Sequence, residues 1–378
     1  MIIMDIKLNN FLAFQNFSMN MSYPKRIVNS FIKDEFLSER PNFRYKKIVI
    51  LMGANATGKT SLGKMLNHIF NFIARRNSDN LIEAVSDKNS PASFSIDFIP
   101  EEHCFSHQFE KNYHLYRLEA RFTPDKNTSE YEITASCKKI KILKHDNYET
   151  ARSRLDKIKS TFTDYINVVR DIPRIGFFFS YPMDVSPNKI PEGYNENYRK
   201  ILEIILRVLD NSIVRVERVQ EAQDSYNIHM LDGRNILIQE GQPVNDALLS
   251  SGTKAGIAIA EIITAMKERR CGFYYCDERF SYIQSDVERA ILAIMSDFIG
   301  NNEQLFFTTH NSDILRMHFP KHSFSFMKKI IKDGKIYISC INADTMLKRN
   351  TDSIRHAVEN DLFSTAPDTD LLFEIKNT

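Results

Sequence analysis

The sequence predicts an α/β fold in which helices flank a mixed central sheet, with an antiparallel β layer and a helical lobe inserted. Three observations support this prediction. The apolar run KKIVILM ends at Met52 and precedes a glycine-rich turn and a helix, as expected of a buried parallel strand. The runs FYYCDE (273–278) and LFFTTH (305–310) enclose a helix, an order that favours two parallel strands. Three runs between 93 and 143 alternate in polarity, which is typical of antiparallel strands.

The first half of the chain supplies most of the expected strands. The stretches MDIKLNNFLAF and QNFSMNMS predict an N-terminal strand pair, and SFSIDFI, HLYRLEARF and YEITASCKKIKIL predict the antiparallel layer. A helix is expected from Gly58, because apolar residues recur at helical spacing at Leu62, Met65, Leu66, Ile69, Phe70 and Ile73.

The middle of the chain predicts the inserted lobe. Residues 147–172 are heavily charged and predict one helix, whereas residues 195–210 predict a more amphipathic one. The run YNIHMLDGRNILI then predicts a hairpin that turns at Asp232 and Gly233.

The last third predicts two helices and a hairpin. The helix that follows the stretch LLSSGTKAG has one apolar face, formed by Ile257, Ala260, Ile263 and Met266. In the helix over 285–300, Ser285 and Glu288 have capping-box spacing and Gly300 occupies the expected C-terminal cap. The final hairpin is expected to turn at Asp333-Gly334.

Composition narrows the class of protein. The chain has 378 residues, of which 43% are hydrophobic and 26% charged, and its formal net charge is +2, so no overall field indicates nucleic acid as a partner. The five cysteines are scattered without zinc-ligand spacing, which favours reduced thiols. The N-terminus lacks a signal-peptide layout and no apolar run approaches the ~20 residues of a membrane span. We therefore expect a soluble cytoplasmic protein that makes no contact with membranes.

The stretch GANATGKT (53–60) matches the phosphate-loop pattern G-x-x-x-x-G-K-[ST]. Backbone N–H groups of such a loop converge on phosphates, and the following helix adds its positive N-terminal end. Lys59 can reach the β and γ phosphates, and the Thr60 hydroxyl can ligate Mg²⁺. We therefore expect ATP and Mg²⁺ as ligands, with the nucleotide held by Gly53, Asn55, Ala56, Thr57, Gly58, Lys59, Thr60 and Ser61.

Two strand ends supply candidate catalytic groups. Asp277 can complete the magnesium shell, and Glu278 can orient or deprotonate the attacking water. His310 ends the next strand and can hydrogen-bond the γ-phosphate or the water. Because ends of parallel strands share one sheet edge, Lys59, Glu278 and His310 are expected to lie close together.

The stretch LLSSGTKAG places Ser250, Ser251 and Gly252 at a second helix start. Free N–H groups and a serine hydroxyl there could bind an anion. On these residues alone, an ordinary helix N-cap is the favoured interpretation.

The order of these motifs changes that interpretation. Along the chain, a phosphate loop is followed by a serine-glycine helix start, an Asp-Glu strand end and a strand-end histidine. This order resembles that of the soluble ATP-binding-cassette ATPases of the RecF, SMC and overcoming-lysogenization-defect group, often grouped as AAA family ATPases. GANATGKT resembles their Walker A motif, LSSGT (249–253) their signature, FYYCDE their Walker B and TTHN their switch histidine. The N-terminal strands are similar to those of RecF-like heads. The resemblance implies an ABC-ATPase head in which two copies clamp ATP, so that Ser250 and Gly252, with Ser251 between them, act on nucleotide held by the partner.

The chain departs from this family's pattern in several places. No glutamine loop can be assigned, since Gln108 lacks a matching context. Gln284 stands where an aspartate is expected, with Asp286 nearby. The helices are too short for SMC-type arms, and the segment after His310 carries no acidic cluster of the kind a fused nuclease would need.

The resemblance implies three segments and a function. Residues 1–145 would form the ATPase lobe with the antiparallel layer, 146–245 the helical and hairpin insert, and 246–378 the signature helix, Walker B, switch histidine and last hairpin of the same head. The implied function is ATP hydrolysis by a homodimer or higher homo-oligomer that regulates a separate nuclease or toxin, in anti-phage defence.

Other functions remain open at this point. The motifs would also suit a transporter's nucleotide-binding subunit, although an insert over 93–245 is atypical of one. A DNA-repair or chromosome-associated head could use the basic stretches CKKIKILKH and ARSRLDKIK, but the near-neutral net charge favours a solvated strand and helix face as their explanation. A scaffold that binds ATP without hydrolysis would not need Asp277, Glu278 and His310.

Overall fold

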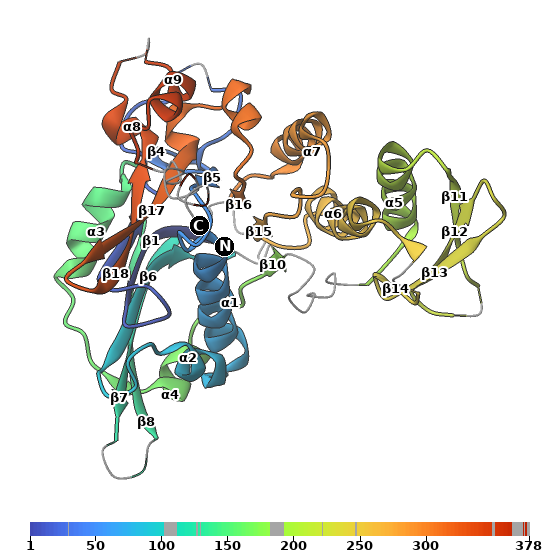
Figure 1. Cartoon of the computed structure of the whole chain (residues 1–378). Helices are drawn as coiled ribbons and strands as arrows, with labels where there is room; N and C mark the ends of the chain where they lie inside the picture. The colour runs from blue at the N-terminus through green and yellow to red at the C-terminus, as the bar shows by residue number, and fades with distance from the viewer. Residues whose placement is uncertain are drawn as a thin grey trace.

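A computed structural model gives the fold of the chain. It describes all residues except 29, 102–111, 126, 127, 129, 182–192, 221, 246, 247, 350, 351, 365–372, 374 and 376–378. Two six-stranded sheets form the body of the molecule, and a smaller four-stranded sheet lies in a lobe to one side (Figure 1).

The central sheet is mixed, as predicted. Its strand order is β10-β15-β16-β5-β17-β18, with every neighbouring pair parallel except the last. The predicted parallel pair of β15 and β16 is therefore confirmed. All residues of β5, β15 and β16 are buried, which explains why their sequences are apolar except for Asp277, Gln304 and Thr308 at the strand ends. The six strands are β10 (Phe177–Ser180), β15 (Phe273–Asp277), β16 (Gln304–Thr308), β5 (Ile48–Met52), β17 (Phe324–Lys332) and β18 (Lys335–Asn342).

Helices cover the two faces of this sheet. Alternate residues of β5 face different cores: Val49 packs in a core with α1 (Lys59–Arg75), and Ile50 in a core with α6 (Ser251–Lys267) and α7 (Ser285–Phe298). At Gly63 of α1, an added Cβ would lie 2.6 Å from the Tyr275 ring of β15. The close contact between this helix and this strand therefore requires a residue without a side chain at position 63.

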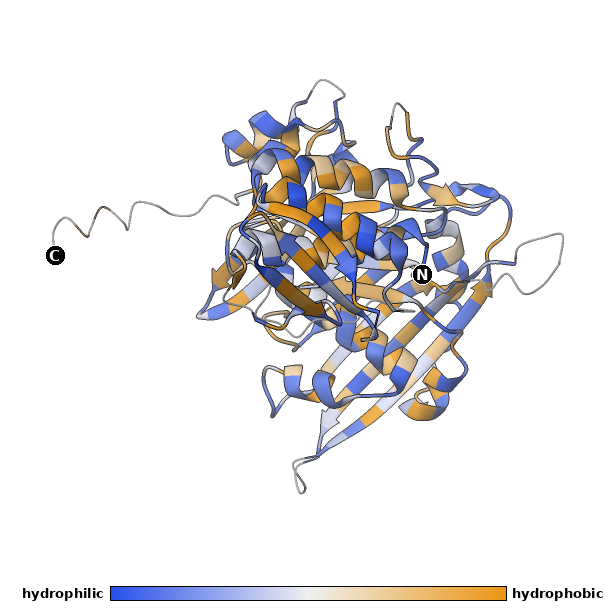
Figure 2. Cartoon of the chain, turned by 90° about the vertical axis from the view of Figure 1, so that its right-hand side faces the viewer, coloured by the Kyte–Doolittle hydropathy of each residue, from blue (hydrophilic) through white to orange (hydrophobic). Residues whose placement is uncertain are grey.

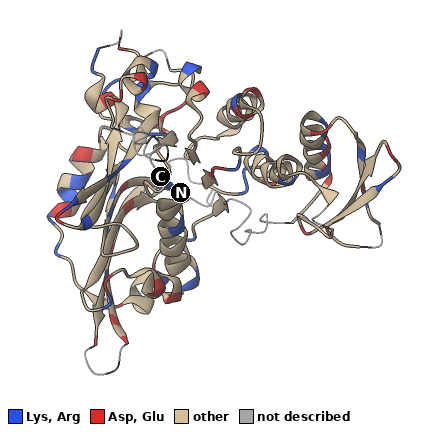
Figure 3. Cartoon of the chain, viewed as in Figure 1, with Lys and Arg blue, Asp and Glu red and all other residues tan. Residues whose placement is uncertain are grey.

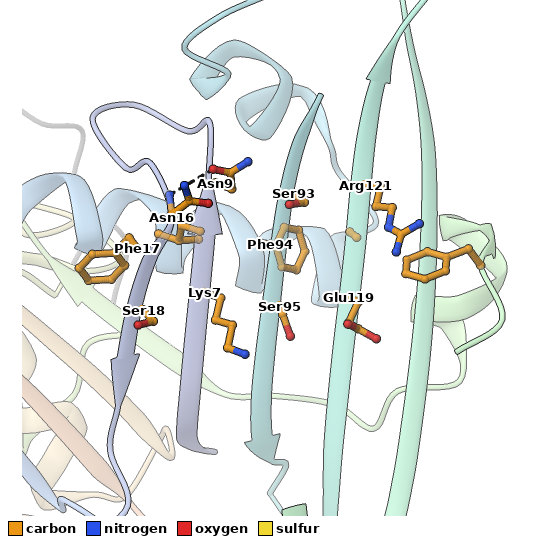
Figure 4. Close-up of a pocket in the computed structure, with 13 residues that line it drawn as sticks. Lys7, Asn9, Asn16, Phe17, Ser18, Ser93, Phe94, Ser95, Glu119 and Arg121 are labelled. Carbon is orange, nitrogen blue, oxygen red and sulfur yellow. Dashed lines mark hydrogen bonds between the residues drawn. The ribbon is translucent and has the colours of Figure 1, made fainter. Parts of the chain in front are cut away.

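The second sheet is the predicted antiparallel layer. Its order is β2-β1-β6-β7-β8-β9, and hydrophobic and hydrophilic residues alternate along its long strands (Figure 2). One face packs on α1. The opposite face is polar in part, and this part forms an open pocket that includes Lys7, Ser95, Glu119 and Arg121 (Figure 4). Elsewhere on that face, Ile2, Met4 and Leu115 lie in a separate buried apolar cluster. The strands are β2 (Phe17–Asn20), β1 (Ile2–Asn9), β6 (Ala92–Ile99), β7 (His114–Pro124), β8 (Tyr131–Lys141) and β9 (Thr163–Asp164).

The single helix predicted over 147–172 is wrong. The structure has α3 (Tyr148–Asp156) and α4 (Tyr165–Arg170), with the short strand β9 between them. The intervening segment is tied to the antiparallel sheet, because Lys138 Nζ donates to the Ile158 carbonyl and Phe162 lies under the Arg121 guanidinium. Tertiary contacts therefore outweigh the helical pattern here.

The side lobe contains the predicted amphipathic helix and hairpin. Helix α5 (Glu196–Leu209) packs against α6, where an added Cβ at Gly256 would lie 2.6 Å from Leu209. Figure 1 places α6 between the body and α5. The lobe's sheet, in order β11-β12-β13-β14, consists of β11 (Ile213–Arg218), β12 (Ser225–Met230), β13 (Asn235–Gln239) and β14 (Gln242–Pro243).

The last predicted hairpin is also present. β17 and β18 turn at Asp333 and Gly334, which both have positive φ (52° and 70°). The remaining elements are short: α2 (Asp79–Ala84), β3 (Phe36–Leu37), β4 (Arg40–Arg44), η2 (Ser312–Arg316), η3 (Lys321–Ser323), α8 (Ala343–Met346) and α9 (Ile354–Glu359).

Two negative findings apply to the described ranges. None of the helices there is long and apolar enough to cross a membrane. Within the same ranges, no cluster of three or more histidine, cysteine or acidic side chains could hold a metal. Cys137, Cys271, Cys276 and Cys340 are free thiols, and Cys104 lies outside the described residues.

Candidate active site

The loop GANATGKT joins β5 to α1 in a conformation that needs glycine. Gly53 has φ 153°, and an added Cβ would lie 2.5 Å from the Met327 carbonyl oxygen. Gly58 is the N-cap of α1 with φ 95° and makes no side-chain cap hydrogen bond. Because glycine has no side chain, it cannot cap the first N–H groups of α1. Helix starts with such uncapped N–H groups bind phosphate.

Lys59 lies at the centre of this loop and is buried. Its Nζ donates to the carbonyl oxygens of Gly53 (2.8 Å) and Ala54 (3.0 Å). It also pairs with Glu278, at 3.0 Å between Nζ and Oε1. This ion pair joins the phosphate loop to the end of β15, so two of the predicted catalytic groups are in contact.

Asp277 is fully buried at the end of β15. Its Oδ1 accepts a hydrogen bond from the Thr308 hydroxyl at 2.6 Å. Burial raises the pKa of this carboxyl, and the Thr308 and Thr60 hydroxyls act in the opposite direction. In the part of the chain that the structure describes, Oδ2 has no hydrogen-bond partner. A buried carboxylate oxygen without a partner, close to Thr60, fits the oxygen ligands that Mg²⁺ prefers.

Thr308 also fixes the backbone of Glu278. The Glu278 N–H donates to Thr308 Oγ1 at 2.9 Å, and Glu278 has φ 42°, a conformation that non-glycine residues adopt rarely. One threonine on β16 therefore holds both Asp277, at the end of β15, and Glu278, which directly follows the strand. The Glu278 side chain is 22% exposed, so a water molecule can reach it.

His310 follows β16 at the same sheet edge and is exposed. Its neighbours in the chain are fixed by α7. The Thr309 hydroxyl donates to Glu288 Oε1 at 2.7 Å, and Asn311 Nδ2 donates to Glu288 Oε2 at 2.6 Å. The loop that carries His310 is therefore bound on both sides to one carboxylate.

These contacts correct the predicted capping box. The N-cap of α7 is Gln284, which makes no side-chain cap hydrogen bond, and the Ser285 hydroxyl donates instead to Asp313 Oδ2 at 2.7 Å. Serine and glutamate have cap spacing, but their side chains turn toward the loop after β16, where buried donors need partners. Gly300 is not a left-handed cap either, because α7 ends at Phe298 and Gly300 lacks a positive φ.

The second helix start has the local structure of an N-cap. The Ser250 oxygen accepts from the Thr253 N–H at 3.1 Å, and its hydroxyl lies 2.7 Å from Thr253 Oγ1. Ser250 and Ser251 are exposed. Gly252 packs against the segment after Glu278, because an added Cβ would lie 3.0 Å from the Tyr282 carbonyl oxygen. The hydrogen bonds of the Ser250 side chain all end on Thr253, within its own helix.

The structure thus joins some predicted residues and not others. Lys59, Asp277 and Glu278 are linked directly or through Thr308, and His310 lies two residues beyond Thr308. Ser250 is the N-cap of α6, and Ser251 and Gly252 lie in its first turn; among the described residues, no hydrogen bond joins the Ser250 side chain to the phosphate loop. Gln108 lies outside the described residues. Asp286, on the first turn of α7, pairs with Arg289.

Sequence reasoning missed three residues that shape this site, namely Thr308, Glu288 and Asn311. The threonine and asparagine stand in the stretch TTHN, whose polar residues directly after a buried strand were a signal. Glu288 was missed because its spacing from Ser285 had been interpreted as a capping box.

Comparisons with known proteins show the family and the fold of the chain. The family model described as "AAA domain, putative AbiEii toxin, Type IV TA system" matches residues 48–316, from the first residue of β5 to the end of η2. No curated protein sequence matches the chain.

Solved structures with a similar fold include SMC heads. One is an SMC head bound to the C-terminal winged-helix domain of ScpA, with 13% identity, a TM-score of 0.51, and coverage of 91% of this chain and 99% of that one. Another is an SMC head with an extended coiled coil, bound to the C-terminal domain of ScpA derived from Pyrococcus furiosus. It has 12% identity, a TM-score of 0.50, and coverage of 92% and 98%. At these identities the likeness concerns the fold alone, which is that of a P-loop ABC-type ATPase head.

Proposed function

The chain belongs to this AAA domain family, and from that premise we propose that it binds Mg²⁺-ATP and hydrolyses it to ADP and phosphate. The observation that carries the proposal is the 3.0 Å contact between Lys59 and Glu278. It places the phosphate-binding lysine and a carboxylate at one point, next to the partly unpartnered Asp277.

Each residue has a role that its surroundings support. The N–H groups at the start of α1 and the Lys59 ammonium bind the β and γ phosphates, and Lys59 exchanges its present carbonyl and carboxylate partners for phosphate oxygens. Thr60 and Asp277 hold Mg²⁺, which neutralises charge that develops on the phosphates. Glu278, released from Lys59, accepts a proton from the attacking water. His310 donates a hydrogen bond to the γ-phosphate or the water.

The signature turn supports an ATP-dependent homodimer. Ser250 and Ser251 are exposed at the N-terminus of the 17-residue helix α6, and the Ser250 side chain bonds to Thr253 of the same helix. A γ-phosphate held by a second copy would give these groups a ligand. We propose that this pairing regulates a separate effector, a nuclease or toxin, in the cytoplasm. The defence role rests on the family alone.

Turnover and assembly measurements test the proposal. The parent protein is expected to release phosphate from ATP only with Mg²⁺. The variant Glu278→Gln should bind ATP, fail to turn over, and shift by light scattering to at least twice the monomer mass. A parent without ATPase activity would refute the enzymatic role, and a constant mass with and without ATP would refute the pairing.

A DNA-associated head is the second candidate, because the fold is that of SMC heads. Two basic residues of the stretches that could bind DNA are paired with carboxylates: Lys138 lies 3.9 Å from Glu119, and Arg154 pairs with Asp146. Basic and acidic residues are interspersed over the body and the lobe (Figure 3). Binding to duplex DNA that weakens steeply with salt would favour this candidate.

A further inference from the structure

The loop after β16 is held by α7 through a set of side-chain hydrogen bonds that ATP hydrolysis, as proposed above, does not by itself require. Glu288 accepts from the Thr309 hydroxyl with one carboxylate oxygen and from the Asn311 amide with the other. These two donors are the residues directly before and after His310. The carboxylate therefore fixes the chain on both sides of the exposed histidine.

Glu288 is well suited to hold a fixed geometry. It is 4% exposed and Thr309 is also 4% exposed, so water competes little for their hydrogen bond. Burial raises the pKa of the Glu288 carboxyl, and the hydrogen bonds from Asn311 and Thr309 act against that rise. A helical residue that accepts two bonds from one loop is a rigid support, since α7 packs in the main core.

A second set of bonds strengthens the same support. The Ser285 hydroxyl donates to Asp313 Oδ2 at 2.7 Å, and Asn311 Nδ2 donates to Ser285 Oγ at 2.9 Å. Asn311 Oδ1 in turn accepts a hydrogen bond from the Asp313 N–H at 2.9 Å, so Asn311 is the N-cap of η2. Two residues of α7, one turn apart, therefore hold the segment from Thr309 to Asp313.

The His310 ring itself makes no hydrogen bond to any residue that the structure describes, so its backbone neighbours fix its position. We propose that Glu288 is a positioning residue that sets the place of His310 at the γ-phosphate. This inference rests on the proposed ATPase function. Glu288 does not touch nucleotide in the proposal; it acts only through the loop.

The first test separates turnover from nucleotide binding. Glu288→Ala removes both acceptors, and kcat is expected to fall about 10- to 100-fold, because a displacement of about 1 Å at a reacting group has this effect. KM for ATP should stay within about twofold, since the phosphate loop is intact. Glu288→Gln keeps an acceptor oxygen and should recover much of the loss. Ser296→Ala, on the same helix but bonded only to the Ala293 carbonyl, is the matched control.

The second test asks whether the loss acts through His310. If it does, adding Glu288→Ala to His310→Ala should lower kcat by less than about twofold more, because coupled residues are non-additive. Multiplicative losses in the double variant, or a Glu288→Ala protein with parental kcat, would overturn the inference while leaving ATP hydrolysis in place. A parent that does not hydrolyse ATP would remove both proposals. Thermal unfolding of each variant identifies any loss of fold.

Discussion

Helices α1 and α6 both begin with small residues and a hydroxyl and run for 17 residues through the core, yet their N-termini differ. The start of α1 has a left-handed glycine as its N-cap and no side-chain cap. The start of α6 has Ser250, whose oxygen accepts from Thr253. The N-terminus of α1 leaves its first N–H groups free of a side-chain cap and open to a ligand. At the N-terminus of α6, the Ser250 side chain already accepts a hydrogen bond from one of these N–H groups. We therefore expect phosphate to bind at the start of α1, whereas at α6 a phosphate would have to compete with an existing cap.

The largest expected effect is at the α1 site. Glu278→Gln should lower the rate of ATP hydrolysis by about 100- to 10,000-fold, the usual contribution of a general base. Phosphate release under saturating ATP measures this. Glu359→Gln, an exposed change on α9, serves as the control. Equal turnover in the variant and the parent would exclude this role for Glu278.

A pH-dependent effect is expected on α6. Burial raises the pKa of Glu261 to about 8, against a hydrogen bond from Tyr194 and the charge of Arg279. Because the pKa of Glu261 in the folded state lies above the ordinary glutamate value of 4.5, the folded state binds more protons, and Glu261 lowers stability as pH rises between these values. Glu261→Gln should therefore gain stability relative to the parent by up to about 1.4 kcal/mol per pH unit in that window.

Urea unfolding of Glu261→Gln and the parent at pH 5, 6.5 and 8 provides the measurement. Parallel pH profiles for the two proteins would contradict the assignment. Replacement of exposed Glu359 by glutamine should leave the profile unchanged.

The close approach of α1 to β15 predicts a loss of stability at Gly63. Gly63→Ala places a Cβ 2.6 Å from the buried Tyr275 ring, and overpacking of this kind costs about 1–3 kcal/mol. Lys64→Ala, in the same turn, should change the free energy of unfolding by less than about 0.5 kcal/mol. Thermal or urea unfolding decides; a Gly63→Ala protein as stable as the parent would show that the ring can move aside.

The smallest effect separates capping from phosphate binding at α6. Ser250→Ala should lower stability by about 1 kcal/mol, the value of an N-cap. Ser353→Ala removes an equivalent N-cap, that of α9, and should lower stability similarly. Only Ser250→Ala should also lower turnover, by about tenfold, the value of a hydrogen bond to a charged group. Equal turnover in Ser250→Ala and Ser353→Ala would show that Ser250 acts only as an N-cap and does not bind phosphate.

Much of the fold could be predicted from the sequence because its strands carry strong local signals. β5 and β15 are fully buried and read as unbroken apolar runs, and the turn at Asp333-Gly334 fits only a tight hairpin. The prediction of one helix over residues 147–172 was wrong because side chains of the antiparallel sheet hold Ile158 and Phe162. No local sequence pattern reveals such contacts.

The site was predictable to the extent that parallel strands bring their ends together. This rule placed Lys59 near Glu278, and the ion pair confirms it. It could not identify Glu288, because the partners of this residue lie more than 20 positions away on another element. Ser250 was ambiguous for a physical reason: one serine at a helix start can serve as a cap or as a phosphate ligand.

Mixing two impaired variants, Lys59→Ala and Ser250→Ala, tests most directly whether the active site is shared between two copies. Lys59→Ala lacks the phosphate lysine but keeps Ser250, and Ser250→Ala lacks only the serine. If each site combines α1 of one copy with α6 of the other, a 1:1 mixture should recover about a quarter of parental turnover, because half of the dimers are mixed and each has one intact site. Turnover no higher than the average of the two separate variants would contradict the account.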